Sequence, residues 1–202
     1  MYRTPNLKRT VDLVISIILV GILFPIFPLI GILIKIWMPG PVFFMQRRIG
    51  KDCIPFTIYK FRTMGTIDPI ESERFEPGDN SRTTRLGKLL RDTKIDEIPQ
   101  LINVLKGDMS LVGPRPEIKK WTEIYTDKWR IVHSVRPGIT DNASLEFRNE
   151  EKILSASGDP EKTYRDLILP RKLDLNIAYT NQQSMMVDMR ILFRTAKEIL
   201  LK

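Results

Sequence analysis

Two adjacent carboxylates, Asp96 and Glu97, lie in a stretch of the sequence that is rich in basic residues. The cations nearest to them along the chain are Arg82, Arg85, Lys88, Arg91 and Lys94. Two acids at the start of a predicted helix commonly act as an N-cap and a first-turn partner of the helix dipole. Alternatively, the helix end and the arginines hold Asp96 ionised, as a nucleophile or a ligand of Mg²⁺ requires. The residues alone leave both interpretations open.

Arg115 lies between Pro114 and Pro116, where the sequence predicts the start of a helix that continues to about Thr126. Prolines on both sides would hold the guanidinium stiffly, next to the free N–H groups of the helix end. Such an arrangement binds anions through a bidentate fork and a helix N-terminus. A surface arginine that caps a turn has the same local sequence, so this alternative also stays open.

A predicted strand supplies further positive charge, because Lys60 and Arg62 alternate with Tyr59 and Phe61. Alternate residues share one face of a strand, so this face would be basic. An edge strand that is kept soluble by its charges has the same pattern. Together, a carboxylate pair and several basic sites of phosphate size favour the transfer of a phosphorylated group.

Short elements must bring these side chains together. Two β-prone runs, 42–46 and 56–61, flank a polar turn around Gly50 and predict a hairpin. Helical patterns run through about 84–92 and 96–105.

Between and after these elements, the Gly- and Pro-containing stretch 65–82 predicts a mobile loop. Residues 110–116 predict a stiff connector, and residues 136–140 predict a turn. The tail from Met185 is an amphipathic helix that either packs on the core or lies in a membrane interface.

Residues 14–34 carry no charge and contain Pro25 and Pro28. About 20 apolar residues just cross a hydrocarbon core of about 30 Å, but Pro25 removes a backbone donor and breaks or kinks the helix. Basic residues flank both ends: Arg3, Lys8 and Arg9 before the segment, and Lys35, Arg47, Arg48 and Lys51 after it. The positive-inside rule therefore gives no preferred threading. We expect a re-entrant hairpin that breaks at Pro25, in preference to a straight span or a buried core helix.

The predicted fold is α+β and mainly helical, in two parts. Residues 1–38 form a re-entrant membrane anchor of helix, break and helix. Residues 39–202 form a compact cytoplasmic catalytic domain at the membrane, with a small β-hairpin and amphipathic interfacial helices. The N-terminal residues lack a short apolar core followed by a small-residue cleavage site, so we interpret them as an anchor and not as a removed signal peptide. An anchor of this kind favours a lipid as one substrate.

Charge is unevenly distributed along the 202 residues. Residues 1–64 hold nine Lys/Arg and two Asp/Glu, so most of the net charge of +8 surrounds the membrane segment. This excess favours contact with anionic lipid headgroups or a phosphorylated substrate. No helix-turn-helix, zinc or base-stacking motif supports nucleic acid as the partner. A single cysteine, Cys53, excludes an internal disulfide, and with the single histidine, His133, it argues against a Cys/His metal site.

Three motifs resemble those of the bacterial sugar transferases, also called monotopic phosphoglycosyl transferases. They are IYKFRTM at 58–64, DEIPQLINVLKGDMSLVGPRP at 96–116 and RPGIT at 136–140. The resemblance extends from the anchor to the C-terminal helix and is most specific in the central motif. The length is similar to that of small members that consist of the catalytic core.

Such enzymes transfer a sugar-1-phosphate from a nucleotide sugar, usually a UDP-sugar, to polyprenyl (undecaprenyl) phosphate and release UMP. The resemblance implies that this protein performs the first membrane step of glycoconjugate biosynthesis, at the cytoplasmic face of the bacterial inner membrane. The implied cofactor is Mg²⁺. The implied partners are the two substrates and membrane lipids, with downstream glycosyltransferases and a second copy of the chain as further candidates.

The resemblance also assigns roles to individual residues. Asp96 would attack the β-phosphorus to form a covalent phosphosugar intermediate and would bind Mg²⁺, while Glu97 would support proton transfer or orientation. Lys60, Arg91 and Arg115 would bind phosphates. The other candidate substrate-binding residues are Gln46, Arg48, Arg136, Thr140 and Asp174.

Two stretches depart from the common family pattern. Phe24 stands where members commonly have a serine before the membrane proline, and it cannot satisfy the backbone groups that the break frees. After RPGIT, residues 141–151 read DNASLEFRNEE instead of continuing with GWAQVNGR, so the family does not predict which sugar is transferred. A non-catalytic membrane adaptor for a glycan-assembly complex is the alternative function, and it would not need the Asp96–Glu97 pair.

Overall fold

The computed structural model describes residues 5–65 and 83–201. Its elements are α1 (Pro5–Leu23), α2 (Ile26–Trp37), β1 (Phe43–Ile49), β2 (Pro55–Phe61), α3 (Arg85–Asp92), α4 (Gln100–Lys106), β3 (Ser110–Val112), α5 (Lys119–Thr122), α6 (Thr126–Val132), β4 (Gly138–Thr140), α7 (Asn142–Glu146), α8 (Glu150–Ser155), α9 (Pro160–Thr163), α10 (Leu169–Gln182) and α11 (Met185–Leu200). The fold is α+β and mainly helical, as predicted. Most of the loop predicted at 65–82 lies outside the described residues, as do Arg3 and Arg82.

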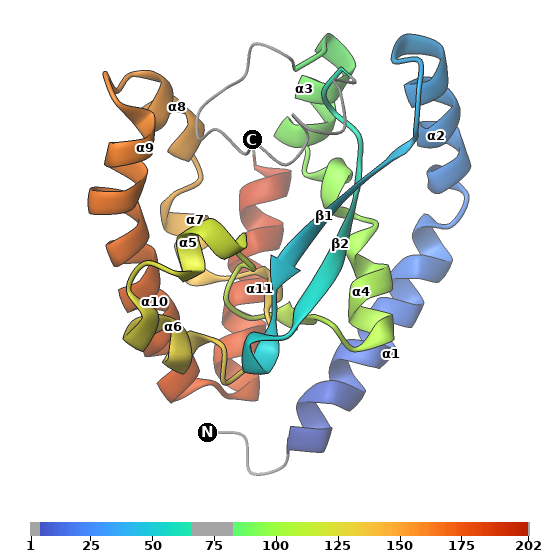
Figure 1. Cartoon of the computed structure of the whole chain (residues 1–202). Coiled ribbons are helices and arrows are strands. Elements are labelled where there is room, and N and C mark those ends of the chain that lie inside the picture. The colour runs from blue at the N-terminus through green and yellow to red at the C-terminus, as the bar shows by residue number, and fades with distance from the viewer. Residues whose placement is uncertain (1–4, 66–82, 202) are drawn as a thin grey trace.

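The N-terminal helices and the α9–α10 helices lie on opposite sides of the molecule. In Figure 1, α1 and α2 follow one side, α9 and α10 follow the opposite side, and the β1–β2 hairpin crosses the space between them. Helix α4 packs against both α1 and β2, and it thereby joins the N-terminal helices to the hairpin.

The N-terminal helix breaks at the predicted proline. Pro25 has no N–H to continue the helical ladder, and α1 ends at Leu23 while α2 begins at Ile26, with a bend of 59° between them. Pro28 lies in the first turn of α2, where a proline is tolerated, and causes no second break. In the part of the chain that the structure describes, no helix alone has the length and apolar character of a span, whereas the bent α1–α2 pair meets both criteria together.

The first turns of α1 dock on the rest of the protein through charged side chains. Lys8 forms an ion pair with Asp188 of α11 and donates a hydrogen bond to the carbonyl oxygen of Val112 at 3.0 Å. The carboxylate of Asp12 accepts a hydrogen bond from the hydroxyl of Ser110 at 2.8 Å. Helix α1 is therefore joined to β3 and α11 before its uncharged half begins.

The predicted hairpin is confirmed. Strands β1 and β2 pair antiparallel from Phe43↔Phe61 to Ile49↔Pro55, so the first strand extends beyond the predicted end at residue 46. A short 3₁₀ turn at Lys51–Cys53 closes the hairpin, with left-handed backbone at Asp52 and Cys53. The pairing places residue 48 of β1 and residue 60 of β2 on neighbouring strands next to the site.

A second, two-stranded sheet lies where the sequence predicted only a connector and a turn. Strands β3 and β4 pair parallel, with Ser110 opposite Gly138 and Val112 opposite Thr140. The backbones approach so closely that a Cβ on Gly138 would lie 2.0 Å from the nitrogen of Gly113. Only glycine fits there. Strands of three residues are too short to show the alternation that identifies a strand in a sequence.

The helix predicted from Pro116 to about Thr126 is wrong. Helix α5 has four residues, and Tyr125, which has left-handed backbone (φ 57°), separates it from α6. The N–H of Ile49 donates to the carbonyl oxygen of Glu117 at 2.9 Å, and this bridge to the hairpin keeps the chain extended before α5. Arg115 consequently lies in an extended segment and not at a helix N-terminus.

Three apolar clusters surround the site and fix the elements that carry it. The first joins β2, α4, β3 and α11 and includes Ile15 of α1. The second joins α5, α6, α8 and α10 around Trp121 and Trp129. The third joins α2, β2 and α3 around Ile34 and Phe61. Burial of side chains of this size supplies most of the favourable free energy of folding.

Candidate active site

Asp96 and Glu97 lie in a single 3₁₀ turn, Ile95–Glu97, and not at the start of a helix as predicted. Pro99 separates this turn from α4, and neither acid caps that helix. Both residues are buried, with exposed fractions of 6% for Asp96 and 8% for Glu97. Burying a carboxylate costs free energy unless it is paired or hydrogen-bonded. The burial of these two acids is therefore not explained by helix capping.

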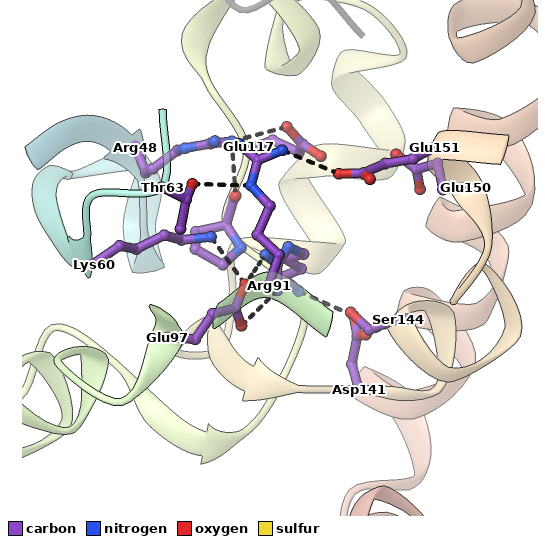
Figure 2. Close-up of polar contacts among 12 residues, drawn as sticks. Arg48, Lys60, Thr63, Arg91, Glu97, Glu117, Asp141, Ser144, Glu150 and Glu151 are labelled. Atoms are coloured by element: carbon purple, nitrogen blue, oxygen red, sulfur yellow. Dashed lines mark hydrogen bonds and ion pairs between the residues drawn. The ribbon is translucent and has the colours of Figure 1, made fainter. Parts of the chain in front are cut away.

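The carboxylate of Glu97 is held by two cations from different parts of the chain. It accepts a hydrogen bond from Lys60 Nζ at 2.9 Å (Figure 2). It also accepts from Arg115 Nη1 and Nη2, at 3.3 and 2.5 Å. Burial alone would raise the pKa of Glu97, but Arg115 and then Lys60 hold this pKa well below its usual value. Glu97 is therefore an ionised anchor for two cations.

Asp96 has the opposite environment. Its Oδ1 is buried and has no hydrogen-bond partner among residues 5–65 and 83–201. Burial raises the pKa of Asp96, the charge of Lys60 opposes this rise, and the charge of Glu97 adds to it. Two neighbouring carboxylates whose pKa values are shifted in opposite directions are typical of sites in which the two groups have different roles.

Asn103 aligns Lys60 with Glu97. This fully buried side chain on α4 donates to the carbonyl oxygen of Thr57 at 2.7 Å and accepts from the N–H of Tyr59 at 3.1 Å. Both partners lie on β2, so the amide fixes α4 against the strand that carries Lys60. Burial lowers the pKa of Lys60, and the charge of Glu97 opposes this shift.

Asp141 holds the backbone of Arg115 in place. This buried carboxylate accepts from the N–H of Arg115 at 3.0 Å and, as the N-cap of α7, from the N–H of Ser144 at 2.6 Å. The sequence reasoning did not assign this role to Asp141. An aspartate directly before a short helical segment is a recognisable N-cap signal, but its second partner, 26 residues earlier in the chain, is not visible in the sequence.

Arg48, Glu117 and Tyr164 form a second polar group next to Arg115. Arg48 donates to Glu117 at 3.2 Å and to the carbonyl oxygen of Pro116 at 3.3 Å, and the Tyr164 hydroxyl donates to Glu117 at 2.5 Å. Burial lowers the pKa of Arg48, an effect that Glu117 opposes and Arg115 reinforces. Glu117 and Tyr164 were not among the predicted site residues.

Arg91 reaches the site from α3. Its Nε donates to the hydroxyl of Thr63 at 2.9 Å, and its Nη1 contacts Thr83 at 3.3 Å and Glu151 at 3.5 Å. Figure 2 shows Arg91 extending between Thr63 on one side and Glu151 of α8 on the other. Arg91 thus brings a guanidinium from α3 to the side of the site where Thr63 and Glu151 lie.

The remaining candidates have other surroundings. Gln46 is half-buried on β1, opposite Ile58. Arg136 is exposed and donates to the carbonyl oxygen of Gly107 at 2.9 Å.

Thr140 and Asp174 also contact residues outside the Lys60–Glu97–Arg115 group. The Thr140 hydroxyl lies 2.7 Å from that of Thr195 on α11. Asp174 forms an exposed ion pair with Lys128 at 2.6 Å. Their roles in substrate binding, like those of Gln46 and Arg136, stay predictions.

One feature of the site fits a magnesium ion, namely the carboxylate oxygen of Asp96 that has no partner among the described residues. Within the described parts of the chain, no group of three or more His, Cys, Asp or Glu side chains is arranged to hold a metal ion. Mg²⁺, however, commonly binds through one or two carboxylates and completes its shell with water and substrate phosphates. The unpartnered oxygen of Asp96 is a hard ligand of this kind, whereas both oxygens of Glu97 already have cationic partners.

The arrangement therefore places Asp96, whose Oδ1 has no partner among the described residues, beside a set of cations on a buried frame. The positive charges of Lys60, Arg115 and Arg48 match the negative charges of Asp96, Glu97 and Glu117. A guanidinium has five N–H donors, and those of Arg115 that Glu97 leaves unused can bind phosphate oxygens.

Comparisons with known proteins agree with this chemistry. The family described as Bacterial sugar transferase matches residues 3–202. A Bacillus subtilis (strain 168) protein named Uncharacterized sugar transferase EpsL is 37% identical over 96% of this chain and 87% of its own length. An Aeromonas hydrophila protein named UDP-N-acetylgalactosamine-undecaprenyl-phosphate N-acetylgalactosaminephosphotransferase is 34% identical over 96% of this chain and 44% of its own length.

A third relative is larger as well. The Escherichia coli (strain K12) protein named UDP-glucose:undecaprenyl-phosphate glucose-1-phosphate transferase is 33% identical over 94% of this chain, which spans 39% of that protein. The chain thus spans less than half of the Aeromonas hydrophila and Escherichia coli proteins, and most of EpsL. Because the family match covers nearly every residue, the chain belongs to the bacterial sugar transferase family.

Proposed function

We propose that this protein transfers a sugar-1-phosphate from a UDP-sugar to polyprenyl (undecaprenyl) phosphate, releasing UMP and forming a polyprenyl-diphosphate sugar. The names of two relatives describe reactions of this type. The observation that carries the proposal is the asymmetry of the carboxylate pair. Glu97 is fixed by Lys60 and Arg115, while the neighbouring Asp96 keeps a buried oxygen without a partner in the described chain.

Asp96 acts as the nucleophile in this proposal. One of its carboxylate oxygens bonds to the β-phosphorus of the UDP-sugar, the bond from that phosphorus to the bridging oxygen breaks, and UMP leaves with the electron pair. A phosphate oxygen of the lipid then attacks the same phosphorus and displaces Asp96 as a free carboxylate. Both attacking groups are anions, so neither step requires a proton. The covalent intermediate lets UMP leave before the lipid enters.

The cations make the approach of these anions favourable. Glu97 holds Lys60 and Arg115 side by side, and these two cations bind the oxygens of the transferred phosphate. Arg91, which lies on α3, binds a second phosphate of the substrate. Preorganised donors of this kind stabilise charge that develops in the transition state. The low pKa of Glu97 suits orientation of these cations and not proton transfer. Mg²⁺, held by Asp96 and substrate phosphates, would supply further charge neutralisation.

The α1–α2 pair acts as a re-entrant anchor at the cytoplasmic face of the bacterial inner membrane. Exposed apolar side chains support this part of the proposal: Ile17, Ile18 and Ile22 on α1, Phe24 at the break, and Leu29, Ile32, Ile36 and Trp37 on α2. Uncovered apolar surface of this extent is typical of a membrane contact. An anchor fixes the site near the headgroups, where the lipid phosphate is already concentrated.

UMP release tests the proposal. Protein in nanodiscs that contain undecaprenyl phosphate would be given Mg²⁺ and a panel of UDP-sugars, and Asp96→Asn would be compared with wild type. We expect lipid-dependent UMP release with at least one donor and a loss of at least about a thousandfold in the variant. Asp52→Asn, an identical change in the exposed hairpin turn, is the matched control and should keep full activity.

The intermediate has its own assay. Without the lipid acceptor, the wild-type protein should release UMP in a stoichiometric burst and gain the mass of a phosphosugar on the peptide that contains Asp96. Substantial turnover by Asp96→Asn, or an adduct on another residue, would overturn the assignment of the nucleophile. A folded protein that is silent with every donor would instead favour the membrane adaptor.

A further inference from the structure

Helix α4 carries two buried carboxamides with different surroundings. Asn103 uses both its N–H donors and its oxygen: it donates to the carbonyl oxygen of Thr57 and to Asp108, and it accepts from the N–H of Tyr59. Gln100 is 1% exposed, and its Nε2 is buried without a hydrogen-bond partner in the part of the chain that the structure describes. An unpaired buried donor in a native protein calls for an explanation.

Gln100 lies one turn after Asp96 along the same face of the chain. Ile98 and Pro99, which link the 3₁₀ turn to α4, have right-handed helical backbone with φ of −53° and −59°, so the turn continues into the helix. Residues four apart on such a backbone are neighbours, with Cβ atoms about 5–6 Å apart. Both ends of the series Asp96, Gln100 and Asn103 face β2, because the 3₁₀ turn packs against this strand and Asn103 bonds its backbone. Gln100 therefore lies beside Asp96 on the side of the site that faces β2.

The side chains of Asp96 and Gln100 lack complementary partners. Asp96 Oδ1 is a buried acceptor and Gln100 Nε2 is a buried donor, and neither atom has a hydrogen-bond partner within residues 5–65 and 83–201. A group that satisfies both must bond to the carboxylate oxygen and accept from the amide. A phosphoryl group on Asp96 does both, because its phosphorus bonds to the carboxylate and its other oxygens are strong acceptors.

We propose that Gln100 is a further catalytic residue, whose Nε2 donates a hydrogen bond to the transferred phosphate while this phosphate is bonded to Asp96. The inference rests on the proposed function. It adds a neutral donor on α4 to the two cations, Lys60 and Arg115, that bind the same phosphate. A donor that is fixed before the reaction stabilises the charge that develops on the phosphate oxygens. Since the same phosphorus is attacked in both steps, Gln100 serves the release of UMP and the transfer to the lipid.

Gln100→Met tests this inference, because methionine keeps the length of the side chain and removes the amide. In the assay without lipid acceptor, we expect the burst of UMP and the gain of phosphosugar mass to slow by about a hundredfold or more. The affinity for UMP should not change, because UMP lacks the transferred phosphate. The midpoint of thermal unfolding should stay equal or rise, because the substitution removes an unpaired buried polar group.

Two further variants complete the test. Gln100→Glu keeps the shape of the side chain and replaces the donor by an acceptor, so it should slow the burst at least as much as Gln100→Met. It carries the test alone if the methionine variant does not fold. Gln182→Met makes the same substitution at the exposed end of α10 and should leave the burst unchanged.

The outcomes separate this inference from the proposed function. A wild-type burst rate in the Gln100 variants would overturn the inference alone. A slower burst together with a lower unfolding midpoint and weaker UMP binding would also overturn it, and would identify Gln100 as a structural residue. A wild-type protein without a burst, or a burst retained by Asp96→Asn, would overturn the proposed function and this inference with it.

Discussion

Arg115 binds Glu97 with both terminal nitrogens of its guanidinium, at 3.3 and 2.5 Å. Lys60 contacts the same carboxylate at 2.9 Å, so each oxygen of Glu97 has at least one cationic donor. The adjacent Asp96 has no hydrogen-bond partner at Oδ1 within residues 5–65 and 83–201. Within two consecutive residues, one carboxylate therefore binds two cations, and the other keeps a buried oxygen without a partner among the described residues.

The first prediction concerns the coupling of this pair. Arg115→Ala leaves Glu97 buried beside one cation, and Glu97→Gln leaves two cations beside a neutral group. We expect each change to lower the free energy of unfolding by about 1–3 kcal/mol, because each strands a charged group. The double variant should lose less than the sum of the two, with a coupling energy of about 0.5–3 kcal/mol. Denaturant unfolding in detergent measures all four proteins, and strictly additive losses would contradict the pairing.

The second prediction concerns Asp141. In Asp141→Asn the amide oxygen can still cap α7, since asparagine is a good N-cap, but the NH₂ group then faces the N–H of Arg115. We expect a loss of about 1–3 kcal/mol in stability and a lower kcat/KM for the donor, because the Arg115 backbone loses its acceptor. Thermal unfolding and UMP release measure the two effects. Wild-type kinetics in this variant would show that the backbone contact does not position Arg115.

The third prediction concerns the packing of α3. A Cβ on Gly87 would lie 1.8 Å from the carbonyl oxygen of Thr63, so Gly87→Ala must push α3 away from the end of β2. Arg91 lies on the same helix and bonds the Thr63 hydroxyl. We expect a destabilisation of about 1–3 kcal/mol and reduced turnover. Gly158→Ala is the control, because its Cβ meets no atom within 4 Å. Equal behaviour of the two variants would argue against the close contact.

The fourth prediction concerns pH. His133, the only histidine of the chain, is buried against the ring of Trp129, and its Nε2 has no hydrogen-bond partner within the described residues. Burial lowers the pKa of His133 below the value of about 6.5 that it has when unfolded. The unfolded state therefore binds the proton more readily, and stability is lost as the pH falls below about 6.5.

Thermal unfolding at pH 7.5 and 5.5 measures this effect. We expect the wild-type midpoint to fall on acidification, and the fall to be smaller in His133→Gln, which has no titrating ring. A fall of equal size in both proteins would assign the acid sensitivity to groups other than His133.

Local features of this fold were predictable because they depend on neighbouring residues. The lack of an N–H at Pro25 is enough to predict the break between α1 and α2, and two β-prone runs on either side of a polar turn around Gly50 are enough to predict the hairpin. The carboxylate pair and its basic neighbours were also recognisable. Each of these signals lies within about one turn or one strand of the residue that it describes.

The partners of each candidate residue were not predictable in the same way. Glu97 meets Lys60 only because Asn103 joins α4 to β2, and it meets Arg115 only because Asp141 fixes that backbone. The helix expected after residue 116 fails for a similar reason, since a bridge from the distant hairpin holds Glu117 extended. Contacts between residues far apart in sequence decide these outcomes, and propensity does not record them.

The docking of α1 also limits how this protein can be simplified for laboratory use. A version trimmed before residue 39 would lose Lys8 and Asp12, and with them the Lys8–Asp188 ion pair and the hydrogen bond from the Ser110 hydroxyl to Asp12. It would also expose the cluster that Ile15 covers. The N-terminal helix is thus part of the catalytic scaffold, and screens for inhibitors need the full chain in a lipid-like medium.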